Sequence, residues 1–144
     1  MSGLQWLKWD LHIHTPYSGW NKEDNSYGFL KEFKDTDKEN EIWEKFISEL
    51  ESSDLDVIGI NDYAHICGYK KVLEFKQQGR LDNIKEILPI VEYRMDKFPV
   101  LKDRENGTKK YANLHIIFPP NKEMSLDNLF DIVKQLGNRE YNEI

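Results

Sequence analysis

Hydrophobic and polar residues are arranged along the chain in ways that predict at least three β-strands. Residues Trp6–Ile13 alternate, as in a strand with one buried face. Leu55–Ile60 (LDVIGI) is a short, largely apolar run, typical of a strand that is buried on both faces. Ile87–Met95 predicts a third strand, with Pro89 near its entrance.

A turn sequence predicts a hairpin in the second half of the chain. Glu105–Thr108 (ENGT) separates two runs typical of strands, Tyr93–Lys102 and Lys110–Phe118. We therefore expect these two runs to pair as antiparallel strands.

Apolar residues spaced three and four positions apart predict helices between the strands. The predicted helices are Glu39–Ser52, Ala64–Gln78 with Gly79 as its stop, and Ser125–Leu136 with Gly137 after it. Tyr17–Lys38 is rich in glycine and polar residues and is predicted as a long loop, a kind of segment that often carries function.

Strands and helices that alternate along the chain predict an α/β fold. The order strand, helix, strand, helix, hairpin, helix is typical of a mostly parallel sheet with crossover helices, either open or curled toward a barrel. The length of 144 residues fits one domain that spans 1–144. In such folds the functional site forms at the carboxyl ends of the strands.

Two histidines at the end of the first predicted strand are the most informative residues. His12 and His14 are two positions apart, so their side chains would project from the same face of the strand. Neutral imidazoles are common metal ligands, and a neighbouring pair can chelate one ion. Because His-x-His alone is a weak motif, two histidines that only form hydrogen bonds remain the alternative.

Polar residues in and after the later strands are the other candidate ligands. Glu92 lies in an apolar run (IVEY), where a buried carboxylate is costly unless it is paired or bound to metal. The alternative is an ion pair with Arg94. His115 lies in a second apolar run (NLHIIF), where it would be either a ligand or a hydrogen-bonded core histidine. Asp62 follows the second strand and would either bind metal or cap the next helix.

Neighbouring residues have weaker assignments. Asp10 shares the face of the two histidines and would either orient an imidazole or face solvent. Tyr63 would either form a hydrogen bond with a substrate phosphate or pack against the sheet. His65 and Cys67 are expected to be structural, and the basic residues Lys70, Lys71 and Arg94 would either meet a phosphate or lie on solvated surface.

Histidine and carboxylate ligands without thiolate favour Zn²⁺, Mn²⁺ or Fe. Two such ions bridged by Glu92 would lower the pKa of a water and stabilise an in-line displacement at phosphorus. We therefore expect two divalent ions, Mn²⁺ or Zn²⁺ with Fe as a further candidate. The expected reaction is phosphoester hydrolysis, with Glu92, Asp62 and Tyr63 as the candidate catalytic residues.

Composition restricts the setting of this chemistry. The formal net charge of −6 excludes a basic field over the whole molecule, although bound cations would reverse the sign locally. The single cysteine, Cys67, excludes an internal disulfide and a thiolate zinc site, as expected in the cytoplasm. No apolar run reaches the ~20 residues of a membrane span, so no membrane partner is expected.

The motifs resemble those of the PHP (polymerase and histidinol phosphatase) family of metal-dependent phosphoesterases. The four similar segments, in chain order, are WDLHIHT at Trp9–Thr15, GINDY at Gly59–Tyr63, IVE at Ile90–Glu92 and LH at Leu114–His115. The resemblance extends from about residue 6 to residue 136. More narrowly, the chain is similar to the N-terminal PHP module of large AAA/SMC-like ATPases of the TrlF group, some of which are associated with phage defence.

This resemblance implies a distorted (β/α)7 barrel in which two or three metal ions are bound by His12, His14, Glu92 and His115. The chain departs from the family pattern at Tyr63, where the family usually has a ligating histidine. It also has Ser18, Gly19 and Trp20 where a further histidine often lies. Since these positions would serve the third metal, we expect that pocket to be altered or empty.

The resemblance also implies a later histidine and a terminal Asp-x-His motif, which these 144 residues do not contain. We therefore expect either part of a longer PHP barrel or a short relative with a degraded site. A partial barrel exposes a strand edge and an apolar interior. That surface would be covered by a second copy in a homo-oligomer, by the remaining half of the barrel, or by another partner such as the ATPase domain.

Three functions remain as hypotheses at this point. The leading one is a phosphoesterase module that acts as a nuclease on the phosphodiester bonds of nucleic acid. The second is a non-catalytic PHP remnant that serves as a scaffold or assembly domain, which the departures from the family pattern favour. The third is a small-molecule phosphatase, which the sequence does not separate from the first.

Overall fold

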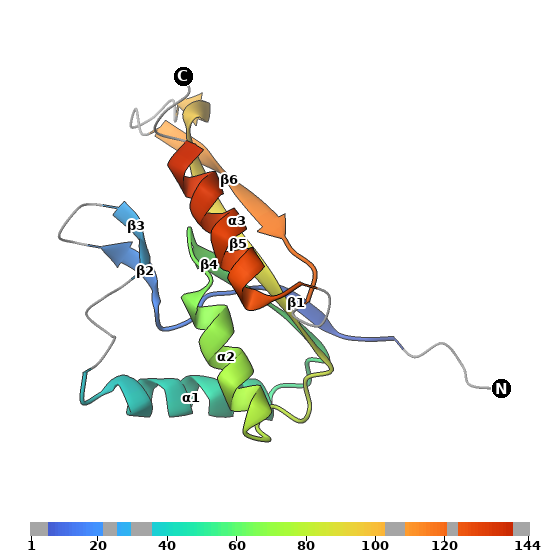
Figure 1. Cartoon of the computed structure of the whole chain (residues 1–144). Helices are drawn as coiled ribbons and strands as arrows, with labels where there is room; N and C mark the ends of the chain where they lie inside the picture. Colours follow the sequence, from blue (N-terminus) through green and yellow to red (C-terminus); the bar gives the residue numbers. More distant parts are fainter. Residues whose placement is uncertain (1–5, 22–25, 30–35, 103–108, 121–123, 140–144) are drawn as a thin grey trace.

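The chain folds into a mixed α/β structure with a curled four-stranded sheet and a separate two-stranded sheet (Figure 1). The computed structural model describes residues 6–21, 26–29, 36–102, 109–120 and 124–139. The elements are β1 (Trp9–Ile13), β2 (Ser18–Asn21), β3 (Ser26–Phe29), α1 (Glu39–Ser52), β4 (Val57–Tyr63), α2 (Cys67–Gln77), β5 (Glu86–Lys102), β6 (Lys109–Ile117) and α3 (Leu126–Arg139).

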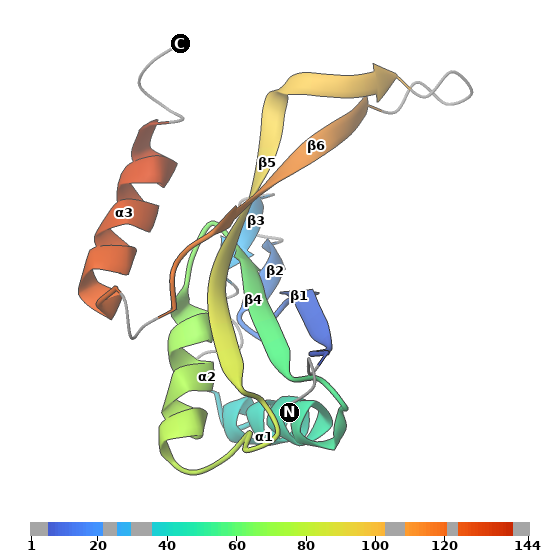
Figure 2. The ribbon, with the colours of Figure 1, turned by 90° about the vertical axis from the view of Figure 1, so that its right-hand side faces the viewer.

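The larger sheet has the strand order β1-β4-β5-β6, and two of its three pairings are parallel. β1 runs parallel to β4, and β4 runs parallel to β5, whereas β6 returns antiparallel to β5. Long β5 and β6 twist away together beyond the other strands (Figure 2). The mostly parallel, curled sheet is therefore confirmed, and its membership of a (β/α)7 barrel stays a prediction.

Most predicted elements are confirmed, with some shifted ends. α1 has the predicted bounds, and Gly79, which follows α2, has a left-handed φ of +82° that suits a helix stop. The predicted hairpin is present, although its first arm and the predicted third strand are one continuous strand, β5. The predicted turn residues 105–108 lie outside the described residues.

Three expectations about local structure were wrong. Tyr17–Lys38 is not a continuous loop, because β2 and β3 pair within it as an antiparallel ladder. α2 begins at Cys67 instead of Ala64, since Ala64 has a left-handed φ of 56°. Gly137 lies inside α3 instead of after it, whereas Pro89 lies near the start of β5, as expected.

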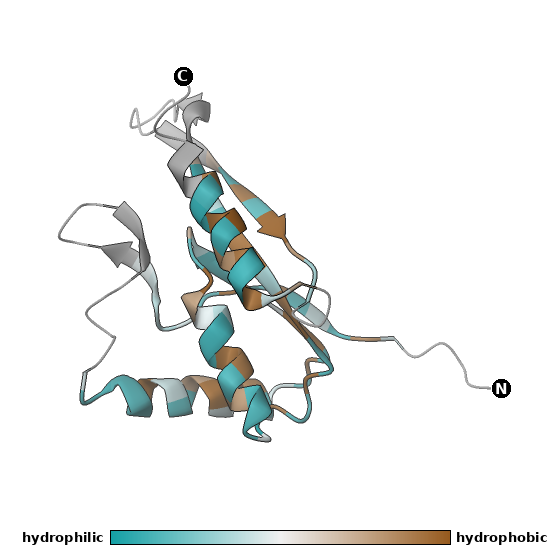
Figure 3. Cartoon of the chain, viewed as in Figure 1, coloured by the Kyte–Doolittle hydropathy of each residue, from teal (hydrophilic) through white to brown (hydrophobic). Residues whose placement is uncertain are grey.

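The hydrophobic core lies between one face of the sheet and the helices. Buried side chains of every second residue in β4 and β5 pack with those of α1, α2 and α3: Ile58, Ile60, Val91, Tyr93, Trp43, Ile47, Tyr69, Val72, Leu129 and Val133. The helices are amphipathic, with hydrophobic and hydrophilic residues on different sides (Figure 3). Because successive strand residues point to opposite faces, the intervening positions of β4 and β5 are left for the other face of the sheet.

Helix α3 is attached to β5 through a buried hydrogen bond. The Tyr93 hydroxyl donates to the carbonyl oxygen of Val133 at 3.2 Å. In the described part of the chain, no helix combines the length and the apolarity that a membrane span requires.

Candidate metal centre

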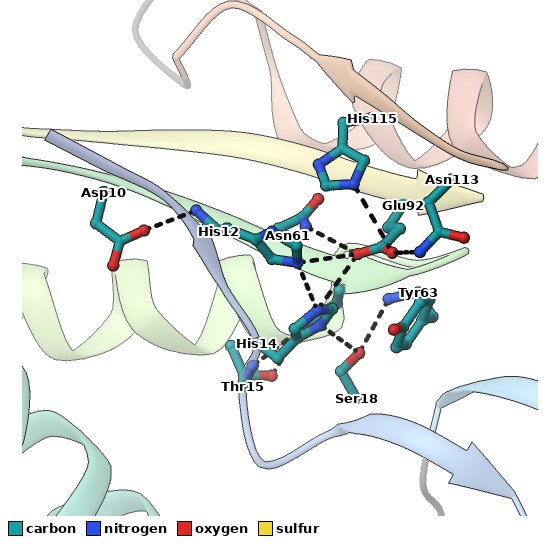
Figure 4. Close-up of polar contacts among 11 residues, drawn as sticks. Asp10, His12, His14, Thr15, Ser18, Asn61, Tyr63, Glu92, Asn113 and His115 are labelled. Atoms are coloured by element: carbon teal, nitrogen blue, oxygen red, sulfur yellow. Dashed lines mark hydrogen bonds and ion pairs between the residues drawn. The ribbon is translucent and has the colours of Figure 1, made fainter. Parts of the chain in front are cut away.

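Three imidazoles surround the carboxylate of Glu92 on the face of the sheet opposite the core (Figure 4). The Nε2 atoms of His12 and His14 lie 3.4 and 3.3 Å from Oε2 of Glu92. The Nε2 atom of His115 lies 3.7 Å from the other oxygen, Oε1. Strand topology led us to expect His14, Asp62, Glu92 and His115 at this edge; His14, Glu92 and His115 converge there with His12, whereas Asp62 does not.

Strand register brings the ligands together. Glu92 of β5 is paired with Tyr63 of β4 and with His115 of β6, so these side chains are neighbours across three strands. His12 lies in β1 and His14 just after it, and their Nε2 atoms are 3.2 Å apart, as expected for residues on the same face. Asp10 does not contact an imidazole here; its Oδ1 accepts the backbone N–H of His12 at 2.9 Å, beside an irregularity in the β1 ladder.

Two asparagines that sequence reasoning missed hold Glu92 in place. The Asn61 amide donates to Oε2 of Glu92 at 2.9 Å, and the Asn113 amide donates to Oε1. Glu92 is only 1% exposed, so its charge would be costly without such partners. Asn61 precedes Tyr63 by two residues and Asn113 precedes His115 by two, and this alternation is the sequence signal that would have found them.

The geometry of the cluster suits a cation. One ligand atom from each of His12, His14 and Glu92 lies within 4.8 Å of the other two, so these residues could hold a metal ion. Imidazole nitrogen and carboxylate oxygen are ligands that Zn²⁺, Mn²⁺ and Fe accept, and the identity of the ion stays a prediction. His12 is 57% exposed, which leaves the cluster open to solvent and to a substrate.

His14 has the protonation state that a ligand requires. Burial lowers the pKa of His14; the negative charge of Glu92 opposes this effect, and the nearby His12 and His115 add to it. The imidazole is therefore neutral at neutral pH. The Tyr63 ring stacks on it, with ring centroids 4.7 Å apart and planes inclined by 22°. The packing alternative for Tyr63 is present, and a contact with phosphate stays a prediction.

Asp62 lies apart from the candidate ligands, because β4 continues to Tyr63 and alternation turns Asp62 toward the helices. Its Oδ1 accepts the backbone N–H of Thr15 and its Oδ2 accepts the Thr15 hydroxyl, both at 2.8 Å. Gly68, in the first turn of α2, lies directly against this carboxylate. Asp62 is therefore not brought to the metal cluster, and the helix-capping role stays a prediction, since the N-cap of α2 has no side-chain hydrogen bond.

The remaining candidates lie outside the cluster. His65 has its Nδ1 3.9 Å from Oδ2 of Asp62, and Cys67 is partly buried at the start of α2. Lys71 pairs with Glu74 at 3.8 Å, whereas Lys70 and Arg94 are exposed. The side chain of Trp20 lies outside the described residues.

Asp62 makes the stability of the protein depend on pH. Burial raises the pKa of Asp62 from 3.8 to about 6, against the opposing effect of its hydrogen bonds from Thr15, Ser18 and Gly68. Between these two pKa values the folded protein holds a proton that the unfolded chain releases, so raising the pH favours unfolding. Proton binding at Asp62 therefore stabilises the folded protein by about 3 kcal/mol at low pH. This stabilisation is fully lost once the pH rises above the folded pKa.

We expect Asp62→Asn to remove this pH dependence. Urea unfolding of both proteins from about pH 4 to about pH 7 measures it, because over this range the wild-type free energy of unfolding should fall by about 2 kcal/mol relative to the variant. Effects of surface groups such as Asp56, whose pKa is lowered mainly by its hydrogen bond with Lys85, cancel in this difference. A difference that is the same at every pH would contradict the prediction.

No protein-family model, curated protein or solved structure matches this chain. The PHP resemblance therefore rests on the motifs themselves, and the case for a functional site rests on the geometry around Glu92.

Proposed function

We propose that this chain is a metal-dependent phosphoesterase module of the PHP type. The observation that carries the proposal is the buried carboxylate of Glu92, which lies within 3.7 Å of three imidazole nitrogens from two different strands and the segment after β1. A buried carboxylate with several imidazoles on an open face is costly for stability alone and is typical of a metal site.

The two oxygens of Glu92 face different histidines, which supports a bridging role. Oε2 faces His12 and His14, whereas Oε1 faces His115. A cation at each oxygen would therefore find imidazole nitrogen beside carboxylate oxygen, and we propose two ions, Mn²⁺ or Zn²⁺ with Fe as an alternative. When bound, such ions polarise a phosphoryl oxygen and lower the pKa of a water.

The residues of the chain would hold this arrangement fixed during the reaction. Asn61 and Asn113 each donate to one oxygen of Glu92, so the carboxylate cannot rotate without losing a hydrogen bond. Tyr63 lies against His14, where its ring restricts the imidazole and limits water on that side. The exposed edge of His12 leaves room for a phosphoester to approach.

We propose phosphodiester bonds of nucleic acid as the substrate, on the narrower resemblance to PHP modules of ATPases. The net charge of −6 is compatible with this substrate only if the cations supply the positive charge at the site. The partner would be an ATPase domain, the rest of a barrel, or a second copy of the chain. Exposed apolar residues on the outer strands, Trp9 of β1 and Ile117 of β6, support such a covering partner.

A scaffold function is the second candidate, and Tyr63 favours it. In the family pattern this position carries a ligating histidine, but here an aromatic ring stacks on His14. A site with fewer ligands would bind metal more weakly, and the domain would then serve assembly instead of hydrolysis.

Metal analysis and hydrolysis assays separate these candidates. Purified protein is analysed for Mn, Zn and Fe, and the double variant His12→Ala, His14→Ala should lose the bound metal. The control His65→Gln, which changes the one histidine outside the cluster, should retain it. The wild-type protein is then assayed on single-stranded DNA, duplex DNA, RNA and p-nitrophenyl phosphate.

Each outcome selects one function. Metal-dependent cleavage of a nucleic acid supports the nuclease, whereas turnover of p-nitrophenyl phosphate alone supports a small-molecule phosphatase. A folded protein that binds no metal would reject both and leave the scaffold.

A further inference from the structure

Beyond the metal-ligand cluster, β5 and β6 continue as a two-stranded ribbon. The last residue of β5 that pairs with β4 is Glu92, and from there to Lys102 the strand pairs with β6. Figure 2 shows these outer parts extending past β1 and β4. We call residues 94–102 and 109–113 the outer ribbon. It starts at the cluster, because the preceding pair in the ladder is Tyr93 with Leu114, next to Glu92 with His115.

The outer ribbon is basic, although the chain as a whole is acidic. Its charged residues are five basic and one acidic: Arg94, Lys97, Lys102, Lys109, Lys110 and Asp96. The formal net charge of the outer ribbon is therefore +4, whereas that of the whole chain is −6. Charge of one sign that gathers on a projecting element is typical of a surface that binds the opposite charge.

The pairing register places basic residues next to one another. Lys102 is paired directly with Lys109, and Lys110 follows in the next pair, opposite Leu101. Like charges at opposite positions of an antiparallel pair destabilise a sheet, whereas opposite charges there would stabilise it. The arrangement is therefore unfavourable for the fold alone and becomes favourable in contact with a polyanion.

Arg94 connects the outer ribbon with the cluster. It follows Glu92 by two residues in β5 and is paired with Asn113, whose amide donates to Glu92. Residues two apart in a strand and residues directly opposite share a face, so Arg94 lies on the face of the sheet that carries the cluster. The residue is exposed. A guanidinium at this position can bind a phosphate through two parallel hydrogen bonds.

We propose that the outer ribbon binds the phosphate backbone of duplex DNA and thereby holds a phosphodiester bond at the metal-ligand cluster. The major groove of duplex DNA admits a two-stranded β-ribbon, and lysines at its edges would reach the phosphates. Arg94 would bind the phosphate nearest to the cluster. The inference rests on the nucleic-acid substrate of the proposed function, but not on bound metal or hydrolysis, because it concerns binding alone.

The salt dependence of DNA binding tests this proposal. Binding of a short labelled DNA duplex to the full chain is measured by fluorescence anisotropy with a chelator present, at several salt concentrations. Each contact with a phosphate contributes about 0.9 to the slope of log K against log[salt]. The slope should therefore become shallower by about 3 in the triple variant Lys102→Gln, Lys109→Gln, Lys110→Gln, and by about 1 in Arg94→Gln.

Matched variants separate direct contact from net charge. Lys45→Gln, Lys70→Gln and Lys134→Gln together remove the same charge from exposed positions, one on each helix, and should leave the slope unchanged. Replacing the three ribbon lysines by arginine keeps their charge and should keep the slope. Circular dichroism checks that each variant is folded, and the single variant Arg94→Gln tests the proposal even if the triple variant does not fold.

Three results would overturn the proposal. The first is a wild-type chain that does not bind the duplex, and the second is a wild-type slope in both ribbon variants. The third is a dependence on the ribbon residues that is seen only with single-stranded DNA or only with polyglutamate, an acidic peptide, because duplex DNA would then not be the ligand.

The failures of the two proposals are distinguishable. A chain that binds no metal and hydrolyses none of the tested phosphoesters, but binds the duplex through the outer ribbon, would remove the proposed function and leave this inference standing. Metal-dependent cleavage of nucleic acid together with a wild-type slope in both ribbon variants would do the reverse.

Discussion

Glu92→Gln is expected to cause the largest loss of metal affinity of any conservative substitution in this chain. The change removes the anionic ligand that lies between the three imidazoles while keeping the size of the side chain. Because Glu92 would contact the metal directly, the affinity for Zn²⁺ or Mn²⁺ should fall by more than the ~10- to 100-fold that loss of an outer partner costs. Titration of metal-free protein by calorimetry measures this loss.

The hydrogen bonds of Glu92 add a cost in stability to the same substitution. Asn61 and Asn113 both donate to the carboxylate, and a glutamine has one oxygen and one NH₂ group. One donor would therefore face another in a buried site, which costs about 1–3 kcal/mol. The free energy of unfolding should fall by this amount even in metal-free protein.

A matched control shows whether the charge at this position matters. Glu49→Gln removes a carboxylate from the exposed side of α1, and it should leave metal affinity and stability unchanged. Metal affinity in Glu92→Gln equal to that of the wild-type protein would exclude Glu92 from the ligand set.

The fold was predictable from sequence where apolar residues keep a regular period. The first helix, Glu39–Ser52, was predicted with its observed bounds because its buried positions recur at helical spacing. The strand pair inside Tyr17–Lys38 was missed, because each strand is four residues long and the segment is rich in glycine and polar residues. Gly137 shows that glycine does not always end a helix, since α3 continues through it to Arg139.

The candidate site was predictable where strand ends and side-chain alternation define it. His14, Glu92 and His115 converge, as expected from a mostly parallel sheet, and His12 joins them from the same face as His14. Asp62 was assigned to the wrong neighbourhood because β4 was expected to end at Ile60. Since the strand in fact continues to Tyr63, alternation places Asn61 beside Glu92 and turns Asp62 away. The register of one strand therefore decides which of two adjacent polar residues reaches the cluster.

Gly68→Ala is expected to destabilise the fold strongly, although alanine is the better helix former. A Cβ at this position would lie 2.1 Å from Oδ2 of Asp62 and 2.1 Å from the Thr15 hydroxyl oxygen. Both side chains are buried and held by their mutual hydrogen bonds, so α2 must shift or these bonds must break. Helix propensity alone would stabilise the variant by ~1 kcal/mol. Overpacking and a lost bond to a charged group outweigh it, and we expect a net loss of about 2–4 kcal/mol in urea unfolding.

The same substitution should weaken metal binding from the far side of β4, because Thr15, which is bonded to Asp62, directly follows His14. Gly79→Ala is the control, because Gly79 has φ +82° and no atom lies within 4 Å of the added Cβ. This substitution should cost only about 1 kcal/mol of backbone strain and leave metal affinity unchanged.

Gly68→Ala should also be less harmful in a Thr15→Ala background, where the crowding is partly relieved. If Gly68→Ala instead raises the free energy of unfolding, the first turn of α2 does not pack against Asp62 and Thr15 as closely as the structure shows.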